Sequence, residues 1–237
     1  MTKNARQFLT LGIDSFIDFQ PAYLFSEIRI YPVKNPAVSV VMPVFNRQSL
    51  LRDSLDSVIN QTFSDFELIC IDDGSTDDSA GILDEYSRLD SRIRVIHQDN
   101  IGVYPSRNVA LGLVEGQYMA SIDCDDIIDS RLLEKAFFRA EAASADITLL
   151  GWDYLNDVFQ SPDLSTWRLA NWNTRIIEDT FPMGFGYVWM KLYRTEFLRK
   201  HNLRFNEKFY AKADVIFHWK SMALSNRICV VREPLYH

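Results

Sequence analysis

Between residues 38 and 150, short apolar runs alternate with segments whose apolar residues recur at helical spacing. The runs lie at 38–42, 66–71, 93–96, 118–122 and 147–150. Mostly apolar runs of this length are typical of parallel strands that are buried on both faces. Because strands and helices alternate, we predict an α/β fold in which helices cover both faces of a mostly parallel sheet.

Polar side chains follow three of the predicted strands, at the point where each strand ends. Asn46 and Arg47 follow the first strand, Asp72 and Asp73 follow the second, and the segment 123–126 follows the fourth. In open parallel sheets, ligands bind outside the carboxyl ends of the strands. The sequence therefore predicts one ligand site that is built from these three turns.

The segment 123–126, with sequence DCDD, places three carboxylates within four residues and is called the acidic segment below. Repulsion between the carboxylates disfavours such a cluster unless a cation lies among them. Carboxylate oxygens suit Mg²⁺ or Mn²⁺, and such an ion could bridge a diphosphate and stabilise it as a leaving group. The alternative is a solvated acidic loop in which Asp129 and Ser130 cap the following helix.

The second turn offers two carboxylates, Asp72 and Asp73, at the end of a buried strand. A carboxylate at this position can accept a hydrogen bond from the ring N–H of uracil or from the ribose hydroxyls. The alternative is an Asx-turn that begins the next helix. We favour the ligand role for Asp73, and both interpretations stay open for Asp72.

Charge and cysteine content narrow the classes of function. The net charge is −7, whereas a sequence-independent nucleic-acid binder needs a cationic surface, so we expect no nucleic-acid partner. The three cysteines, Cys70, Cys124 and Cys229, form no metal-binding or disulfide pattern, which predicts reduced, buried thiols in a cytoplasmic protein. No apolar run reaches the length of a membrane span.

Residues 1–36 are crowded with apolar side chains at loosely helical spacing, and prolines follow. This pattern predicts an N-terminal helical extension that packs on the main domain. The alternative is contact with a membrane surface or a partner chain, which the small number of cations disfavours. We divide the rest of the chain into 37–150 and 151–237, and expect the second part to supply the other wall of a cleft.

Several motifs, in order and at matching spacing, resemble family 2 glycosyltransferases. The stretch 38–46 resembles the opening strand of that family, and 60–63 with 66–77 is similar to its next stretch. Further matches lie at 102, 106–108, 116–118, 123–126, 189–193 and 204–207. The resemblance implies a GT-A fold, a Rossmann-like sheet flanked by helices, with a nucleotide-sugar-binding part at 37–150 and a smaller acceptor-side part at 151–237.

The resemblance also implies a UDP-sugar donor and the residues that contact it. The residues expected at the donor are Pro43, Phe45, Asn46, Asp73, Arg107, Asp123 and Trp152. Pro43, Phe45 and Asp73 would line the uracil pocket, with the ring of Phe45 stacked on the base. Aromatic side chains suit this role because their faces pack on planar rings.

The remaining implied roles concern the phosphates, the metal and the acceptor. Arg107 would face the phosphates or the sugar, Asp123 would contact the ribose or the sugar, and Asp125 would bind Mn²⁺ or Mg²⁺. Trp189 and Lys191 are expected at the acceptor. The alternatives are core packing for the tryptophans and a solvated ammonium for the lysine.

The resemblance implies an inverting reaction with a single carboxylate base, taken from a Glu-Asp pair beyond the segment 189–193. Here the matching positions are Ala213 and Asp214, so the aspartate is present and the glutamate is not. We expect Asp214 to be the base. A rival pair, Glu178 and Asp179, lies before 189–193 and is therefore out of order for the family.

These observations favour an inverting, metal-dependent transfer of a hexosyl or N-acetylhexosaminyl group from a UDP-sugar to a saccharide or glycolipid. We expect the reaction in surface polysaccharide biosynthesis, in the cytoplasm, with peripheral association at the inner face of the membrane. The alternative is a non-catalytic nucleotide or carbohydrate binding module, which Ala213 leaves open. A nucleotidyltransferase is disfavoured because the turn at 43–47 contains no glycine to hold a triphosphate. Because the family usually continues beyond the position of His237, we expect a truncated chain or one domain of a longer enzyme.

Overall fold

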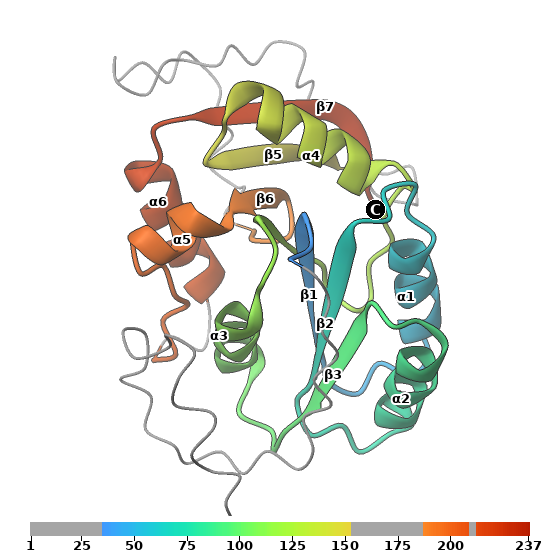
Figure 1. The fold of residues 1–237 in the computed structure, drawn as a ribbon. Coiled ribbons are helices and arrows are strands. Elements are labelled where there is room, and N and C mark those ends of the chain that lie inside the picture. The colour runs from blue at the N-terminus through green and yellow to red at the C-terminus, as the bar shows by residue number, and fades with distance from the viewer. Residues whose placement is uncertain (1–34, 153–186, 209–211) are drawn as a thin grey trace, which may run out of the picture.

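The computed structural model describes residues 35–152, 187–208 and 212–237. Seven strands form one sheet in the order β3-β2-β1-β4-β6-β5-β7 (Figure 1). The strands are β1 Val38–Val44, β2 Phe66–Asp72, β3 Ile93–His97, β4 Tyr118–Ser121, β5 Ile147–Trp152, β6 Lys191–Arg194 and β7 Ile228–Tyr236. The helices are α1 Leu51–Ile59, α2 Ser79–Leu89, α3 Val103–Leu113, α4 Leu132–Ala143, α5 Thr195–Lys200 and α6 Ala213–Leu224.

The pairing of the strands confirms the predicted α/β fold with a mostly parallel sheet. β1 runs parallel to β2 and β4, β2 runs parallel to β3, and β5 runs parallel to β7. β6 is antiparallel to both of its neighbours, β4 and β5. This strand had no counterpart among the predicted ones, because Lys191 and Arg194 at its two ends interrupt the apolar pattern.

The central strands are apolar because both faces of the sheet are covered. All seven residues of β1 and all seven of β2 are buried. Side chains alternate between the two faces, so Val40 and Met42 pack with residues of α1, α2 and α4, whereas Val41 packs with residues of α3, α5 and α6. Figure 1 shows α1 and α2 on one side of the sheet and α3, α5 and α6 on the other.

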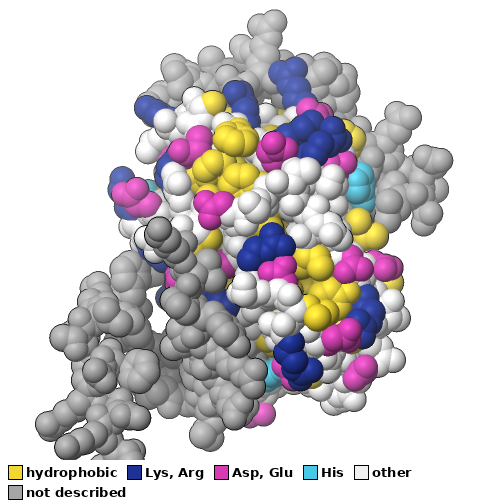
Figure 2. Space-filling view, turned by 45° about the vertical axis from the view of Figure 1, so that its right-hand side comes forward, with side chains coloured by type: hydrophobic (Ala, Val, Ile, Leu, Met, Phe, Trp, Pro, Cys, Tyr) yellow, Lys and Arg dark blue, Asp and Glu magenta, His cyan; other side chains and the backbone are white. Residues whose placement is uncertain are grey.

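Charged side chains on the α1–α2 side of the molecule are intermixed. Figure 2 shows Lys and Arg next to Asp and Glu at several places on this face. One such pair joins the two helices, because Arg52 Nη2 lies 2.6 Å from Glu85 Oε2. Charge on the described part of this face is therefore neutralised locally rather than collected into one basic or acidic patch.

β7 is nine residues long and continues to Tyr236. Beyond Pro234 its backbone pairs with the residues that follow the acidic segment. The N–H of Ile127 donates to the carbonyl of His237 at 3.0 Å, and the N–H of Asp129 donates to that of Leu235 at 2.8 Å. The end of β7 therefore lies beside the acidic segment.

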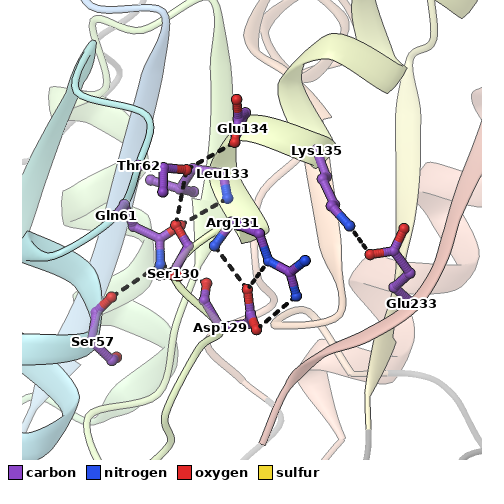
Figure 3. A network of polar contacts seen from close by, with 10 residues as sticks. All are labelled: Ser57, Gln61, Thr62, Asp129, Ser130, Arg131, Leu133, Glu134, Lys135 and Glu233. Carbon is purple, nitrogen blue, oxygen red and sulfur yellow. Dashed lines mark hydrogen bonds and ion pairs between the residues drawn. The ribbon is translucent and has the colours of Figure 1, made fainter.

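Gln61 connects the end of α1 to the start of α4 (Figure 3). Its amide nitrogen donates to the carbonyls of Ser57 at 3.0 Å and Asp129 at 2.8 Å. Its amide oxygen accepts the N–H of Leu133 at 3.0 Å, one of the amides that a helix leaves unpaired in its first turn. Gln61 therefore caps α4 from outside the helix. Arg131, the residue directly before α4, makes no capping hydrogen bond with its side chain.

Several sequence predictions fall outside the described residues or stay untested. The N-terminal helical extension lies almost wholly in 1–34, and Glu178 with Asp179 lies in 153–186. The proposed division after residue 150 falls within β5, and residues from both parts contribute strands to one sheet. The three cysteines are buried and unpaired, as predicted. Among the helices that the structure describes, none has the length and apolar character that crossing a membrane requires.

Candidate active site

The turn after β1 is held against the turn after β2 by Asn46. Its backbone has a positive φ of 51°, a conformation that asparagine tolerates better than most residues. Its side-chain oxygen accepts the N–H of Thr76 at 2.8 Å, and its own N–H donates to Ser75 Oγ at 3.1 Å. These bonds leave Phe45 42% exposed at the edge of the sheet, while Pro43 is buried within β1.

Asp73, directly after β2, is 3% exposed and organises the loop that leads into α3. Its Oδ1 accepts hydrogen bonds from Gln98 Nε2 at 2.8 Å and from the N–H of Ile101 at 2.9 Å. Its Oδ2 accepts the N–H of Gly102 at 2.8 Å. Each carboxylate oxygen has two lone pairs, so Oδ2 retains the capacity to accept one more hydrogen bond.

Asp72 is tied to its neighbours by a histidine. His97 Nδ1 lies 2.8 Å from Asp72 Oδ2, and its Nε2 lies 3.2 Å from Asp84 Oδ1. The hydrogen bond to Asp72 raises the pKa of His97. Burial opposes ionisation of Asp72, but hydrogen bonds from His97 and Ser75 outweigh it and lower the pKa of Asp72. Asp72 Oδ1 also accepts the N–H of Ser75 at 3.1 Å, the hydrogen bond of an Asx-turn.

Two arginines accompany the acidic segment. Arg47 Nε lies 3.1 Å from Asp125 Oδ2 in an exposed ion pair, and Arg107 Nη2 donates to Asp123 Oδ1. Burial, together with the charges of Asp123 and Asp125, raises the pKa of Asp126 to about 6. The cluster therefore has the repulsion that its sequence predicts, and arginine side chains supply part of the compensating charge.

Arg107 lies on α3 and is buried beneath the acidic segment, with its guanidinium 5.8 Å from the ring centre of Phe205. Its Nε is buried and has no hydrogen-bond acceptor among the described residues. A buried donor without a partner is unfavourable, and a ligand oxygen or a water molecule would satisfy it. Within the described residues, no group of three His, Cys, Asp or Glu side chains is arranged to hold a metal ion.

Asp214 lies in the first turn of α6 and contacts the opposite wall of the site. Tyr104 Oη, on α3, donates to Asp214 Oδ1 at 3.3 Å. The preceding residue, Ala213, is fully buried. The site therefore has a methyl group in closely packed surroundings where the resemblance implies a glutamate.

Three of the residues predicted at sugar or acceptor lie close together. The ring of Trp189 stacks on Tyr187 at 5.3 Å and meets the edge of Trp152 at 5.9 Å between ring centres. Lys191 is 1% exposed, and its ammonium donates to the carbonyl of Tyr187 at 2.5 Å. Burial lowers the pKa of Lys191 to about 7, against the opposing charge of Asp214. The ammonium of Lys191 therefore binds the backbone carbonyl of Tyr187 and does not face solvent.

Four residues near the site carried no functional prediction: Arg47, Gln61, Tyr104 and Tyr236. Gln61 belongs to a motif that only the family resemblance singles out. Arg47 follows a strand end, which is a signal for a ligand edge but not for a pairing with Asp125. Tyr104 and Tyr236 make contacts across more than 100 residues of sequence, and no local pattern indicates such contacts.

The topology of the sheet and the polar side chains at its carboxyl edge are those of the GT-A fold. The family model described as Glycosyl transferase family 2 matches residues 39–201, and the chain belongs to that family. The structure is similar to the crystal structure of S. aureus TarS 1-349 in complex with UDP-GlcNAc, with TM-score 0.73 and 26% identity, covering 84% of this chain and 57% of that chain.

Two curated relatives have similar sequences. "Uncharacterized glycosyltransferase EpsJ" of Bacillus subtilis is 31% identical over 85% of this chain and 60% of its own length. "Poly(ribitol-phosphate) beta-N-acetylglucosaminyltransferase TarS" of Staphylococcus aureus is 29% identical over 84% of this chain and 35% of its own length. The chain therefore spans less than two thirds of the length of each of these relatives.

Proposed function

We propose that the protein transfers a hexosyl or N-acetylhexosaminyl group from a UDP-sugar to a saccharide or glycolipid in surface polysaccharide biosynthesis, with inversion. One observation carries the proposal. The acidic segment, with Arg107 and Arg47 beside it, forms one wall of the carboxyl edge, and Asp214 reaches that edge from the other wall. The UDP-GlcNAc complex of TarS supports this choice of donor.

The donor would lie across the turns after β1, β2 and β4. Phe45 exposes a ring at that edge for the uracil, next to the buried Pro43. Asp73 Oδ2 has the capacity to accept the uracil N–H, and Asn46 shapes the turn through its bonds to 75–76. Arg107 Nε has a free donor for a phosphate oxygen, with Asp123 beside it.

Asp125 is the proposed ligand of Mn²⁺ or Mg²⁺. Its carboxylate is exposed and suits a hard divalent ion, whose chemistry would be to neutralise the leaving diphosphate. Because a single protein carboxylate leaves most coordination positions open, the diphosphate and water would fill the others. Arg47 would have to give up its ion pair with Asp125, which is exposed and therefore costs little to break.

Asp214 is the proposed base. It would accept the proton of the acceptor hydroxyl as that oxygen attacks the anomeric carbon, on the face opposite the departing UDP. Asp214 lies in the first turn of α6, and the hydroxyl of Tyr104 donates to its Oδ1, which fixes the orientation of the carboxylate.

Trp189 and Trp152 are the proposed platform for sugar rings, with Tyr187 half-exposed beside them. Lys191 would act on the acceptor through Tyr187, whose carbonyl it holds. We propose a cytoplasmic reaction, which the three free cysteines support, with peripheral association at the inner membrane face if the acceptor is a glycolipid.

A non-catalytic nucleotide-binding module is the second candidate, because the buried Ala213 replaces the expected glutamate. Turnover decides between the two.

UDP affinity should be roughly tenfold or more higher with Mn²⁺ than with a chelator, since the metal neutralises phosphate charge. Asp125→Ala should abolish the difference, and Asp53→Ala, which removes an exposed carboxylate of α1, should preserve it.

Calorimetric titration with UDP measures this difference, and release of UDP from UDP-GlcNAc in the presence of Mn²⁺ measures turnover. Equal UDP affinity with Mn²⁺ and with chelator would contradict the metal assignment. Tight binding without any release of UDP, over a panel of UDP-sugars with and without saccharide acceptors, would favour the binding module.

A further inference from the structure

Tyr236, the last residue of β7, joins both ends of the acidic segment with one hydroxyl group. Its Oη accepts the backbone N–H of Asp123 at 3.1 Å and donates to Asp126 Oδ2 at 2.7 Å. The side chain is 2% exposed, so these bonds are shielded from competing water. A single phenol thus spans the four residues that contain the proposed metal ligand.

The backbone on either side of Tyr236 fixes the residues that follow. The N–H of His237 donates to the carbonyl of Ile127 at 2.8 Å, and the N–H of Ile127 returns a bond to His237 at 3.0 Å. The N–H of Asp129 donates to the carbonyl of Leu235 at 2.8 Å. The loop after the acidic segment is therefore anchored by backbone bonds, while the segment itself is anchored by the phenol.

The ring of Tyr236 belongs to the aromatic group on the other side of the site. It stacks on Trp189 with 4.5 Å between ring centres and 26° between planes. Trp189 in turn contacts Tyr187 and Trp152. Tyr236 is thus shared between the acidic segment and the proposed acceptor platform.

We propose that Tyr236 is a positioning residue that holds the acidic segment in the conformation needed for metal-dependent binding of the donor. The inference rests on the proposed function, in which Asp125 binds a metal together with UDP. Three neighbouring carboxylates repel one another, so the segment needs restraint to present Asp125 in one place. Loss of the hydroxyl would leave the buried N–H of Asp123 without its partner and remove the donor to Asp126.

Tyr236→Phe tests the proposal, because it deletes only the hydroxyl and retains the ring on Trp189. Tyr118→Phe is a matched control, because Tyr118 is the first residue of β4 and lies at the amino ends of the parallel strands, away from the carboxyl edge. Its phenol is also buried and also has two partners, Glu141 Oε1 at 2.5 Å and Arg194 Nη2 at 2.5 Å. Both variants lose a buried hydroxyl with two hydrogen bonds, so general destabilisation affects them alike.

The measured quantity is the ratio of UDP affinity with Mn²⁺ to UDP affinity with chelator. We expect Tyr236→Phe to reduce this ratio by about fivefold or more, toward a value of one, as for lost bonds to charged or buried groups, and Tyr118→Phe to leave it unchanged. Because both affinities come from the same sample, a partly unfolded fraction lowers the number of binding sites and not the ratio.

The outcomes separate this inference from the proposed function. A wild-type ratio well above one that Tyr236→Phe retains would overturn the positioning role alone. A wild-type ratio of one would overturn metal-dependent donor binding and the inference with it. If the ratio falls in both Tyr236→Phe and Tyr118→Phe, the loss of any buried hydroxyl is enough to lower it. That outcome also overturns the positioning role of Tyr236.

Discussion

The two walls of the site are stabilised in different ways. On the donor side, the turns after β1 and β2 are joined by polar side chains, with Asp73 accepting three hydrogen bonds and Asn46 making bonds to both residues of 75–76. On the acceptor side, rings dominate: Trp189 is stacked between Tyr187 and Tyr236. Polar networks fix direction and rings provide contact area, so we expect the proposed donor wall to be preorganised for one ligand and the proposed acceptor wall to offer a packing surface.

This difference predicts that substitutions in one wall affect UDP binding, whereas substitutions in the other wall affect sugar transfer. Substitutions in the donor wall should lower UDP affinity, because its polar groups are already aligned in the described structure. A substitution at Asp214 should lower the rate of transfer and leave UDP affinity alone, since Asp214 contacts α3 through the hydroxyl of Tyr104 and takes no part in the proposed uracil and phosphate contacts. The predictions below test that separation in order of decreasing effect.

The largest effect is expected for Asp214→Asn. The amide keeps the shape of the side chain but cannot accept the proton, so sugar transfer should fall by about 10²–10⁴-fold, the range for a general base. UDP affinity in the presence of Mn²⁺ should stay within about twofold of the wild-type value. Transfer rate and calorimetric UDP affinity are measured on the same preparation.

Glu196→Gln is the matched control for Asp214→Asn, because Glu196 is also an acidic residue in the first turn of a helix, on the same side of the sheet as α6. It should transfer sugar at the wild-type rate. If Asp214→Asn also retains the wild-type rate, Asp214 merely begins α6, and Glu178 and Asp179 become the next carboxylates to substitute.

A smaller effect, on binding, is expected for Asp73→Asn. The amide offers one oxygen in place of two, so one of the three donors around Asp73 meets an NH₂ group and the uracil loses its acceptor. UDP affinity should fall roughly 10–100-fold, since hydrogen bonds to a charged group contribute about 1.5–3 kcal/mol.

Asp77→Asn provides the comparison for Asp73→Asn. Asp77 also accepts two backbone amides beside the β2 turn, from Gln48 at 3.1 Å and Ser79 at 2.9 Å, but has no proposed ligand role. An equal loss of UDP affinity in both variants would mean that turn geometry, and not the Asp73 carboxylate, determines binding.

The contrast between the walls also explains which features the sequence could predict. β1 to β4 follow from apolar runs, because a parallel strand covered on both faces leaves that pattern in four to seven consecutive residues. The polar residues at their ends follow from topology, because parallel strands share one carboxyl edge. For this reason topology predicts which turns form the donor wall, whereas the roles of single residues in it rest on the family resemblance.

The acceptor wall depends on contacts that a local pattern does not contain. β6 has four residues and runs antiparallel between β4 and β5, so its place in the sheet depends on partners more than 40 residues away. Tyr236 reaches Asp126 across 110 residues, and Gln61 reaches Leu133 across 72. Periodicity describes one element at a time, which is why these pairings became visible only in three dimensions.

The smallest expected effect concerns the pH dependence of the donor wall. His97 lies between Asp72 and Asp84, and the bond to Asp72 raises its pKa above the ordinary 6.5. A raised folded-state pKa contributes stability that is complete below 6.5 and is lost as pH rises through the folded-state value. The pKa of Lys191 is lowered, so its contribution has the opposite sign, and it increases the stability of the folded protein as pH rises above about 7. The pH dependence of the wild-type protein therefore combines both groups and does not isolate the contribution of His97.

The isolating quantity is the difference in melting temperature between wild-type protein and His97→Gln, measured at pH 6 and at pH 9. The difference should shrink by about 1–3 °C at the higher pH. The His97 side chain is 35% exposed, so its pair with Asp72 contributes at most about 1 kcal/mol to stability, which corresponds to about 2–4 °C in melting temperature. His201→Gln, which alters a histidine packed on Phe197, should show no such change. A difference that stays constant from pH 6 to pH 9 would mean that His97 holds Asp72 as a neutral hydrogen-bond donor, and the donor wall would then owe its alignment to uncharged bonds.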